Sequence, residues 1–412
     1  MRTSSTRHRG RRAAVTAVLG LLLVGTAGTP ASAESTREEQ WFLDAMKAEQ
    51  MWQTSTGKGI TVAVIDSGVD PNNPDLNGRV LPGKDLAPNQ PGDEHTDYEG
   101  HGTGMAGLIA GTGASGGGEG AFGLAPGSKI LPIRLPKGGT EANLAEGNKV
   151  FNEALALAIR YAADEGARVI NISQAATAGS PQVTAAVEYA LDKGSLIFAG
   201  VGNDGNKANQ FLYPAATPGV VGVAAVGKDL RRTDVSEYGP QVDMAAPGED
   251  MLHACGGETG LCETSGTSDA TALASASAAL IWSKHPTWTN NQVLRVMLNT
   301  IGAPTDGKKR NDAIGYGIVR PRIALQNPGD PGEADVYPLP DLSAAEASAS
   351  PSSNASATEA GNPPAKGAGS QTSASSSEDN GSTSLWIGLG IGAAVLGGAL
   401  AAGFAIARRQ RA

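Results

Sequence analysis

Cysteine, histidine and aromatic residues are scarce in this chain of 412 residues, which holds two cysteines, five histidines and 4% aromatic side chains. Two cysteines are too few for the usual zinc cage, and the neighbouring His253 does not complete one. In CGGETGLC, Cys255 and Cys262 are therefore expected to form a disulfide if this part of the chain lies outside the cell.

Basic residues are outnumbered as well, with 32 Lys and Arg against 41 Asp and Glu and a net charge of −9. Five arginines lie within the first 12 residues and three within the last five, so the chain between them is more acidic still. An acidic surface repels a phosphate backbone, and this excludes nucleic acid as a partner.

Long apolar runs occur only near the two ends. Residues 1–33 combine several arginines, an apolar stretch and the small-residue site Ala31-Ser32-Ala33, which predicts a cleaved signal peptide. An uncleaved anchor is the alternative, but this apolar stretch falls short of the roughly 20 residues that a membrane span needs. Residues 385–407 carry no charge and precede three arginines in 408–412. They predict a single transmembrane helix with a cytoplasmic carboxyl end, although a buried core helix would also be apolar.

Three further segments follow from composition. Residues 327–384 are rich in Pro, Ser, Ala and Gly and poor in apolar residues, so they predict a flexible linker. Residues 59–326 have the composition of a folded domain. The leader at 34–58 is expected to dock on that domain through a helical stripe of apolar side chains, namely Trp41, Ala45, Ala48 and Trp52.

Between residues 34 and 326, apolar runs alternate with helical patterns. The strand candidates are ITVAVID, KILPIRL, ARVINIS, SLIFAGVG, VVGVAAV and VDMAAPG, and residues 143–165 form the clearest helix candidate. Nearly continuous apolar strands are typical of a parallel sheet that helices cover on both faces, so the expected fold class is α/β. Functional side chains in such folds gather at the carboxyl ends of the strands.

Three residues together suggest acyl transfer. Asp66 ends the strand candidate ITVAVID, His101 lies between glycines in EGHGTGMAG, and Ser268 opens a helix of small residues. Each has an ordinary reading by itself, as a turn acid, a buried turn histidine and a helix N-cap. Combined, they supply a nucleophile, a base of suitable pKa and a carboxylate that orients the base.

Four segments, VAVIDSGVD, GHGTGMAGLIAG, GNDG and GTSDAT, occur in the order found in subtilisin-like serine proteases, and the resemblance extends over residues 41–325. It implies a three-layer domain with a mostly parallel central sheet and no cofactor. It also implies that Asp66 orients His101, that His101 is the general base and acid, and that Ser268 is the nucleophile. Asn203 would donate to the oxyanion, and the Tyr213-Pro214 bond would be cis.

The same resemblance implies an extended polypeptide substrate that pairs with Ser173 onward and with the stretch from Gly200 to Gly202. Two differences from the usual family sequence lie in the site itself. Gln174-Ala175-Ala176 replaces the usual Leu-Gly-Gly and should reshape the pocket for the residue before the cut. Asp269 replaces an apolar residue, and its charge would raise the pKa of His101 if the two came close.

The loop cluster of Asp93, His95, Asp97 and His101 could also be drawn as a metal site. We disfavour that reading because the loop is rich in Pro and Gly and because His101 is better explained by the serine protease motif. No acidic loop has recognisable calcium-binding spacing.

The short leader REEQWFLDAMKAEQMW, the cysteine pair and the carboxyl-terminal anchor resemble the mycosins, the membrane-tethered subtilases associated with type VII secretion. The chain is therefore expected to be an extracytoplasmic serine endopeptidase anchored in the cell membrane, with a type VII secretion complex as a partner. The alternative is a structural or protein-binding subunit of such a complex that has little or no catalytic activity.

Overall fold

The computed structural model describes residues 35–138, 142–257 and 259–349. Within these ranges, no helix combines the length and the apolar character that crossing a bilayer requires. The predicted signal peptide and the predicted membrane helix at 385–407 fall outside the described residues and stay predictions.

A seven-stranded sheet forms the centre of the fold, with the strand order β2-β3-β1-β4-β5-β6-β7 and parallel pairing throughout. All six strand candidates of the sequence lie in it, and only the two-residue β2 was missed. The strands are β1 (Thr61–Asp66), β2 (Lys84–Asp85), β3 (Lys129–Arg134), β4 (Val169–Ile172), β5 (Leu196–Gly200), β6 (Val221–Val226) and β7 (Met244–Pro247).

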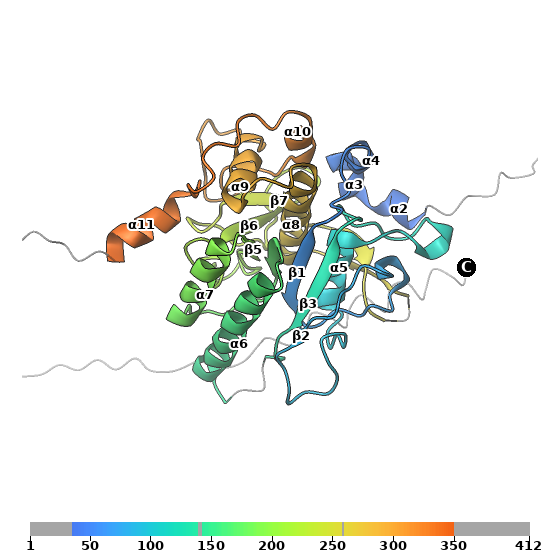
Figure 1. Cartoon of the computed structure of the whole chain (residues 1–412), viewed down its shortest axis with the longest axis horizontal. Helices are drawn as coiled ribbons and strands as arrows, with labels where there is room; N and C mark the ends of the chain where they lie inside the picture. The colour runs from blue at the N-terminus through green and yellow to red at the C-terminus, as the bar shows by residue number, and fades with distance from the viewer. Residues whose placement is uncertain (1–34, 139–141, 258, 350–412) are drawn as a thin grey trace, which may run out of the picture. The chain divides into compact units, whose positions relative to one another are not determined.

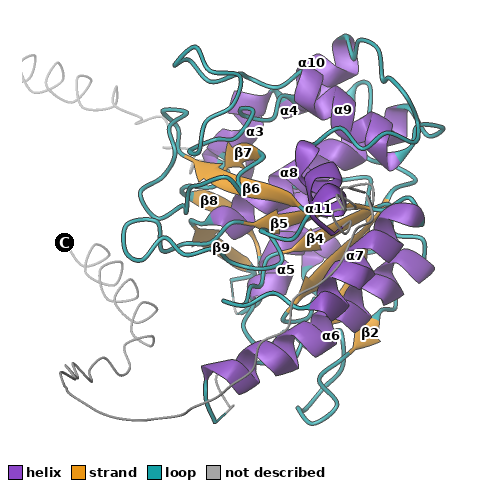
Figure 2. Cartoon of the chain, turned by 90° about the vertical axis from the view of Figure 1, so that its left-hand side faces the viewer, coloured by secondary structure: helices purple, strands orange, loops and turns teal. Residues whose placement is uncertain are grey.

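Helices cover both faces of the sheet, which confirms the predicted three-layer α/β arrangement (Figures 1 and 2). Alternate residues of β1 show the division: Val62 and Val64 join one buried core, while Ala63 and Ile65 join the other. The first core contains α5 (His101–Ala110), α8 (Thr267–Lys284), α9 (Asn290–Asn299) and α10 (Pro321–Gln326). The second contains α6 (Leu144–Asp164), at the predicted helix, and α7 (Pro181–Asp192).

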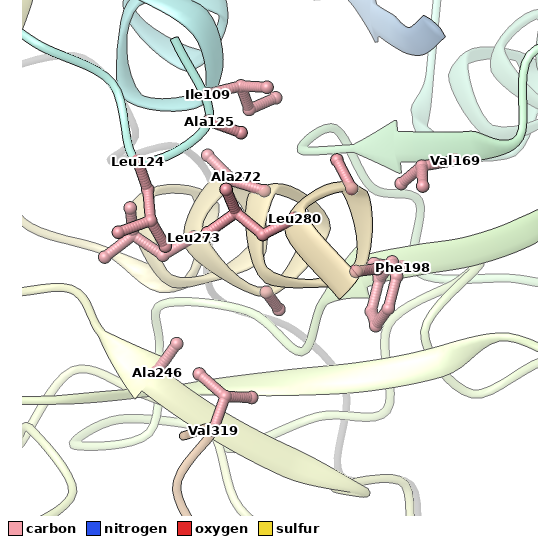
Figure 3. Close-up of a cluster of buried hydrophobic side chains, with 14 of the residues drawn as sticks. Ile109, Leu124, Ala125, Val169, Phe198, Ala246, Ala272, Leu273, Leu280 and Val319 are labelled. Carbon is pink, nitrogen blue, oxygen red and sulfur yellow. The ribbon is translucent and has the colours of Figure 1, made fainter. Parts of the chain in front are cut away.

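Helix α8 runs through the first core and is buried along most of its length. It packs against β4, β5, β6 and β7 and also against α5, α9 and α10. Figure 3 shows its Ala272, Leu273 and Leu280 among side chains from several other elements, including Ile109 of α5 and Phe198 of β5. A helix enclosed on nearly all sides needs small residues, which explains its many alanines and serines.

The leader packs on the domain, and the expected apolar stripe contributes only in part: Ala48 is buried and Trp41 and Trp52 are partly buried against the core. It folds into three short helices, α2 (Thr36–Glu39), α3 (Trp41–Met46) and α4 (Ala48–Trp52), and α3 and α4 are separated by Lys47, whose φ is 59°. This break rotates the apolar face, so Phe42, Leu43, Ala48 and Met51 are buried. Ala45 is exposed, and Trp41 and Trp52 are only partly buried.

The predicted linker begins too early. Residues 327–349 are described, and the first part of them packs on the domain before α11 (Pro340–Ala349). Arg295 donates to the carbonyls of Pro331, Glu333 and Val336, and Leu339 is 2% exposed. The segment is poor in apolar residues, but hydrogen bonds to its backbone and one buried leucine suffice to hold it.

Gln40 ties the leader to two distant segments. Its side chain is fully buried, donates to the carbonyls of Phe122 (2.8 Å) and Leu252 (3.0 Å), and accepts from the Phe122 N–H (2.9 Å). A truncation here would remove the partners of three partly buried backbone groups.

We therefore expect Gln40→Ala to lower the free energy of unfolding by about 1–3 kcal/mol, measured by urea denaturation. Gln50→Ala is the matched control, because Gln50 is exposed on α4 and should change the stability little. Equal stability losses in the two variants would contradict the anchoring role of Gln40.

Candidate active site

Asp66 is the last residue of β1, at the carboxyl edge of the sheet, and it is fully buried. Its Oδ1 accepts hydrogen bonds from the Ser67 N–H (2.7 Å) and from Nδ1 of His101 (2.8 Å). A carboxylate only accepts, so Nδ1 of His101 carries the proton. The other ring nitrogen, Nε2, is then free to accept a proton.

His101 is the first residue of α5, and glycines bring this helix close to its neighbours. A Cβ on Gly102 would lie 2.1 Å from the carbonyl oxygen of Gly68, in the turn after β1. The preceding Gly100 has a φ of 75°, which favours glycine. The glycines around His101 therefore bring its imidazole to the end of β1, and its side chain stays 30% exposed.

Asp97 fixes the start of α5, a role that the sequence analysis missed. Its two carboxylate oxygens accept from the N–H groups of Gly100 and Thr103, both at 2.8 Å, and from the Thr103 hydroxyl at 2.6 Å. The Ser67 hydroxyl also donates to it, at 2.7 Å. Asp97 thus satisfies N–H groups at the amino end of the helix that carries His101, whose N-cap residue is Gly100.

The other members of the alternative metal cluster have separate contacts. Asp93 accepts from the N–H of His95 and from the Thr96 hydroxyl within its own loop. His95 places Nε2 3.1 Å from the carbonyl oxygen of Leu81. His101 faces Asp66 instead. Each of these residues therefore has a local role that needs no metal ion.

Ser268 lies in the first turn of α8, between Thr267 and Asp269. The N-cap of this helix is Gly266, which has no side chain to satisfy the first N–H groups. The Ser268 hydroxyl donates to the carbonyl of Ser173, at 3.4 Å. Among the hydrogen bonds of the described residues, none joins Ser268 to His101, a contact that is often loose until substrate binds.

Asn203 follows β5, and its side chain faces the same helix start. Its Oδ1 accepts from the Thr267 N–H (2.9 Å), which leaves the Nδ2 amide group as the donor beside Gly266. Helix α8 thus begins with an amide donor from Asn203 next to its own N–H groups. Such a pair can stabilise negative charge that develops on an oxygen atom.

Gln174 contacts the site directly, which the sequence did not reveal. Its Nε2 donates to Oδ1 of Asp66 at 3.3 Å. The same residue lines a pocket of about 430 Å³ with Leu135, Val150, Phe151, Ala175 and Ala176. The departure from the usual Leu-Gly-Gly therefore affects both the pocket and the buried carboxylate.

Some of the backbone groups that were expected to bind the substrate have hydrogen-bond partners within the chain. The N–H of Gly202 donates to the Thr267 hydroxyl, and its carbonyl accepts from the Glu237 N–H. Ala176 forms two backbone hydrogen bonds with Tyr213, which precedes the cis Tyr213-Pro214 bond expected from the sequence. At Gly202 the N–H is thus occupied and the carbonyl already accepts one hydrogen bond, and substrate contacts at Ser173, Gly200 and Gly202 stay predictions.

The electrostatics around His101 are dominated by carboxylates. Burial opposes protonation of the ring, but the charge of Asp66 and its hydrogen bond outweigh burial, with smaller contributions from Asp269 and Asp97, and the pKa of His101 rises to about 9. Burial acts to raise the pKa of Asp66, but the charge and hydrogen bond of His101 lower it overall. The expected effect of Asp269 on His101 is present, although it is not the largest.

Cys255 and Cys262 form the predicted disulfide, which closes a hairpin of β8 (Met251–Ala254) and β9 (Leu261–Thr264). In this hairpin His253 pairs across from Cys262. His253 is buried, and its hydrogen-bond partners could not be read from the sequence.

Comparison with known proteins identifies the family that this chain matches. The model of the Subtilase family matches residues 57–317. Thermitase of Thermoactinomyces vulgaris is 35% identical over 245 residues, which are 60% of this chain and 82% of thermitase. Subtilisin of Bacillus pumilus is 35% identical over 243 residues, covering 58% of this chain and 83% of that protein.

Solved structures give a related result. MycP1 from Mycobacterium smegmatis superposes with a TM-score of 0.63 at 28% identity, over 76% of this chain and 90% of that chain. MycP3 protease from the type VII (ESX-3) secretion system superposes with a TM-score of 0.60 at 32% identity, over 73% and 90% of the two chains. The fold of the described domain is thus shared with mycosins.

We expect a titration of the histidine ring protons by NMR to give His101 a pKa of about 9. Asp66→Asn should bring that pKa below the ordinary 6.5, because burial would then act without its largest opposing charge. Asp229→Asn, which alters an exposed loop carboxylate, is the control. A value for His101 that does not respond to Asp66→Asn would contradict this account of the pair.

Proposed function

Because the chain belongs to the subtilase family and is a serine protease, we propose that Asp66, His101 and Ser268 form its catalytic triad, with Asn203 as an oxyanion donor. The observation that carries this proposal is the hydrogen bond between buried Asp66 and His101, at 2.8 Å, near the helix start that bears Ser268 and has glycine as its N-cap. These groups come from three separate elements, β1, α5 and α8.

The first half of the reaction begins at Ser268. Its hydroxyl leaves the Ser173 carbonyl and gives its proton to Nε2 of His101, while Nδ1–H stays bonded to Asp66. The Ser268 oxygen attacks the peptide carbonyl carbon, and the carbonyl oxygen gains negative charge. Nδ2 of Asn203 and the Ser268 N–H donate to that oxygen. The intermediate collapses when His101 returns the proton to the departing amine, which leaves an acyl group on Ser268.

The second half repeats these steps with water. His101 takes a proton from water, and the resulting hydroxide attacks the acyl carbon. Collapse of the second tetrahedral intermediate breaks the bond to Ser268, which regains its proton from His101, and the carboxyl product leaves. Since His101 must be neutral to accept a proton, its raised pKa favours this chemistry at alkaline pH.

The substrate in this proposal is an extended polypeptide. It would lie along residues 173–175 and place a side chain in the 430 Å³ pocket beside Gln174. Val150, Phe151 and Leu135 make that pocket largely apolar, and Asn143 and Asn148 provide polar groups. This lining favours a medium-sized apolar side chain near the cleaved bond.

We also propose a location and a partner. The signal peptide at 1–33 and the membrane helix at 385–407 would place the protease outside the cytoplasm, anchored in the cell membrane. MycP1 and MycP3, which share the fold, are proteases of the ESX-1 and ESX-3 type VII secretion systems. A similar secretion complex is the proposed partner.

Replacement of the nucleophile tests the proposal. Ser268→Ala should abolish hydrolysis of a peptide substrate, and labelling by a fluorophosphonate probe should disappear with it. The melting temperature should stay close to that of the native chain, since the side chain makes one weak hydrogen bond. Undiminished hydrolysis, or labelling of a different serine, would exclude Ser268 as the nucleophile.

The oxyanion role has its own test. Asn203→Ala should lower kcat by about 10²–10³, the loss known from removal of the equivalent donor in a subtilisin, with little change in KM. Asn209→Ala serves as a comparison in the same loop, because it removes an asparagine whose side chain bonds only to the backbone of Tyr238. Similar kcat losses in both variants would assign Asn203 a role in loop structure instead.

A further inference from the structure

The disulfide hairpin contacts both of the helices that carry His101 and Ser268. Strand β8 packs on α5, and β9 leads directly into α8 through residues 265 and 266. The hairpin contains His253 on β8 and Thr264 on β9, neither of which has a part in the chemistry proposed above. Its position allows it to influence the spacing of the two helices.

On the α5 side, the contact depends on glycines. A Cβ on Gly104 would lie 2.6 Å from Cε1 of His253, and a Cβ on Gly107 would lie 2.5 Å from the carbonyl oxygen of Ala254. Gly104 is three residues after His101 on the same helix. The His253 ring therefore occupies space that any other side chain at Gly104 would fill.

On the α8 side, the same ring is joined to the residue after Ser268. Nε2 of His253 lies 2.8 Å from Oγ1 of Thr264, and the Thr264 hydroxyl is hydrogen bonded to the Asp269 carboxyl group. His253 and Asp269 are each 2% exposed, and their nearest nitrogen and oxygen atoms are 3.8 Å apart. Thr264 thus bridges two buried titratable groups.

One shared proton gives every donor and acceptor in this series of hydrogen bonds a partner. Nδ1 of His253 must donate to the Ala254 carbonyl, 2.9 Å away, because a carbonyl only accepts. Either neutral Asp269 donates to Thr264 and Thr264 donates to Nε2, or protonated Nε2 donates to Thr264 and Thr264 donates to the carboxylate. Both arrangements have zero net charge. Burial raises the pKa of Asp269 and lowers that of His253, and the charge of each group on the other opposes these shifts.

We propose that His253, Thr264 and Asp269 form a positioning relay, held by the disulfide hairpin, that fixes the first turn of α8 against α5 and thereby sets Ser268 relative to His101. The relay touches neither substrate nor the reacting atoms. It rests on the proposed function, since it assigns these residues a purpose only if Ser268 and His101 react together.

The relay should matter for rate more than for binding. A displacement of about 1 Å between reacting groups can cost about 10²-fold in rate. The pocket beside Gln174 lies on α6 and on the segments that follow β3 and β4, none of which contacts the relay through the hydrogen bonds described above. Loss of the relay should therefore lower kcat and leave KM nearly unchanged.

Two substitutions at Thr264 separate the hydroxyl from the shape of the side chain. Thr264→Val keeps the shape and removes the bridge, and it should lower kcat about 10- to 100-fold with KM within about threefold. Thr264→Ser keeps the hydroxyl and should retain kcat within about threefold of the native chain. Glu263→Gln, at an exposed neighbour on the same strand, is the control and should leave both constants unchanged. The full chain is assayed with a peptide substrate.

Three outcomes would overturn the proposal: a native kcat in Thr264→Val, equal losses in the valine and serine variants, or a loss confined to KM. If Thr264→Val does not fold, Thr264→Ala takes its place. That smaller variant also removes the hydroxyl that joins His253 to Asp269, so it should lower kcat without changing KM, and a native kcat would refute the relay.

A second experiment removes the disulfide. The double substitution Cys255→Ser and Cys262→Ser should lower kcat in the same manner. Its effect should be less than multiplicative with that of Thr264→Val, because both changes loosen the same hairpin. Fully multiplicative effects would contradict a common cause. The proposed function is judged separately by Ser268→Ala, which must abolish hydrolysis whatever the relay variants do.

Discussion

The close packing of α5 against α8 is the constraint on which the rest of the structure depends. Glycines on α5 allow it to approach the turn after β1 and the disulfide hairpin, and the small residues of α8 allow it to be enclosed by its neighbours, α5 among them. The first turn of each helix carries a residue of the candidate site. The parallel strand β1 ends beside the start of α5 and supplies Asp66. A larger side chain at Gly102 would collide with the turn after β1, so the site and the core share the same requirement for small residues.

Several carboxyl groups surround one imidazole, and the structure gives each a different role. Asp66 bonds to His101 directly, and its charge is the main reason that the pKa of His101 is raised. Asp97 is occupied by backbone and hydroxyl donors at the start of α5. Asp269 is buried and bonded to Thr264. An acidic residue beside Ser268 is thus compatible with the proposed role of His101 as a base, because Asp66 and Asp97 accept hydrogen bonds and Asp269 is bonded to Thr264.

The segments outside the central domain also connect to the site. Gln40 of the leader holds the Leu252 carbonyl, one residue before His253 in the hairpin. At the other end, Arg295 and Leu339 fasten the segment after α10 to the domain. Continuous contacts therefore run from the leader through β8 to the first turn of α8. Stability of the leader and geometry of the site are consequences of the same packing.

The sequence by itself predicted the six longer strands of the central sheet, the helix at 143–165 and the cysteine pair, because apolar periodicity and short motifs are local properties of a chain. It also named Asp66, His101, Asn203 and Ser268 as the candidate site. Only the tertiary structure decided the buried face of the leader, where Lys47 interrupts the helix, and the packing of residues 327–349, which depends on Arg295 from a distant helix. It also decided the bond from Gln174 to Asp66 and the bridge through Thr264. Those contacts join residues remote in sequence, and no local pattern encodes a distance between two side chains that meet only after the sheet has formed.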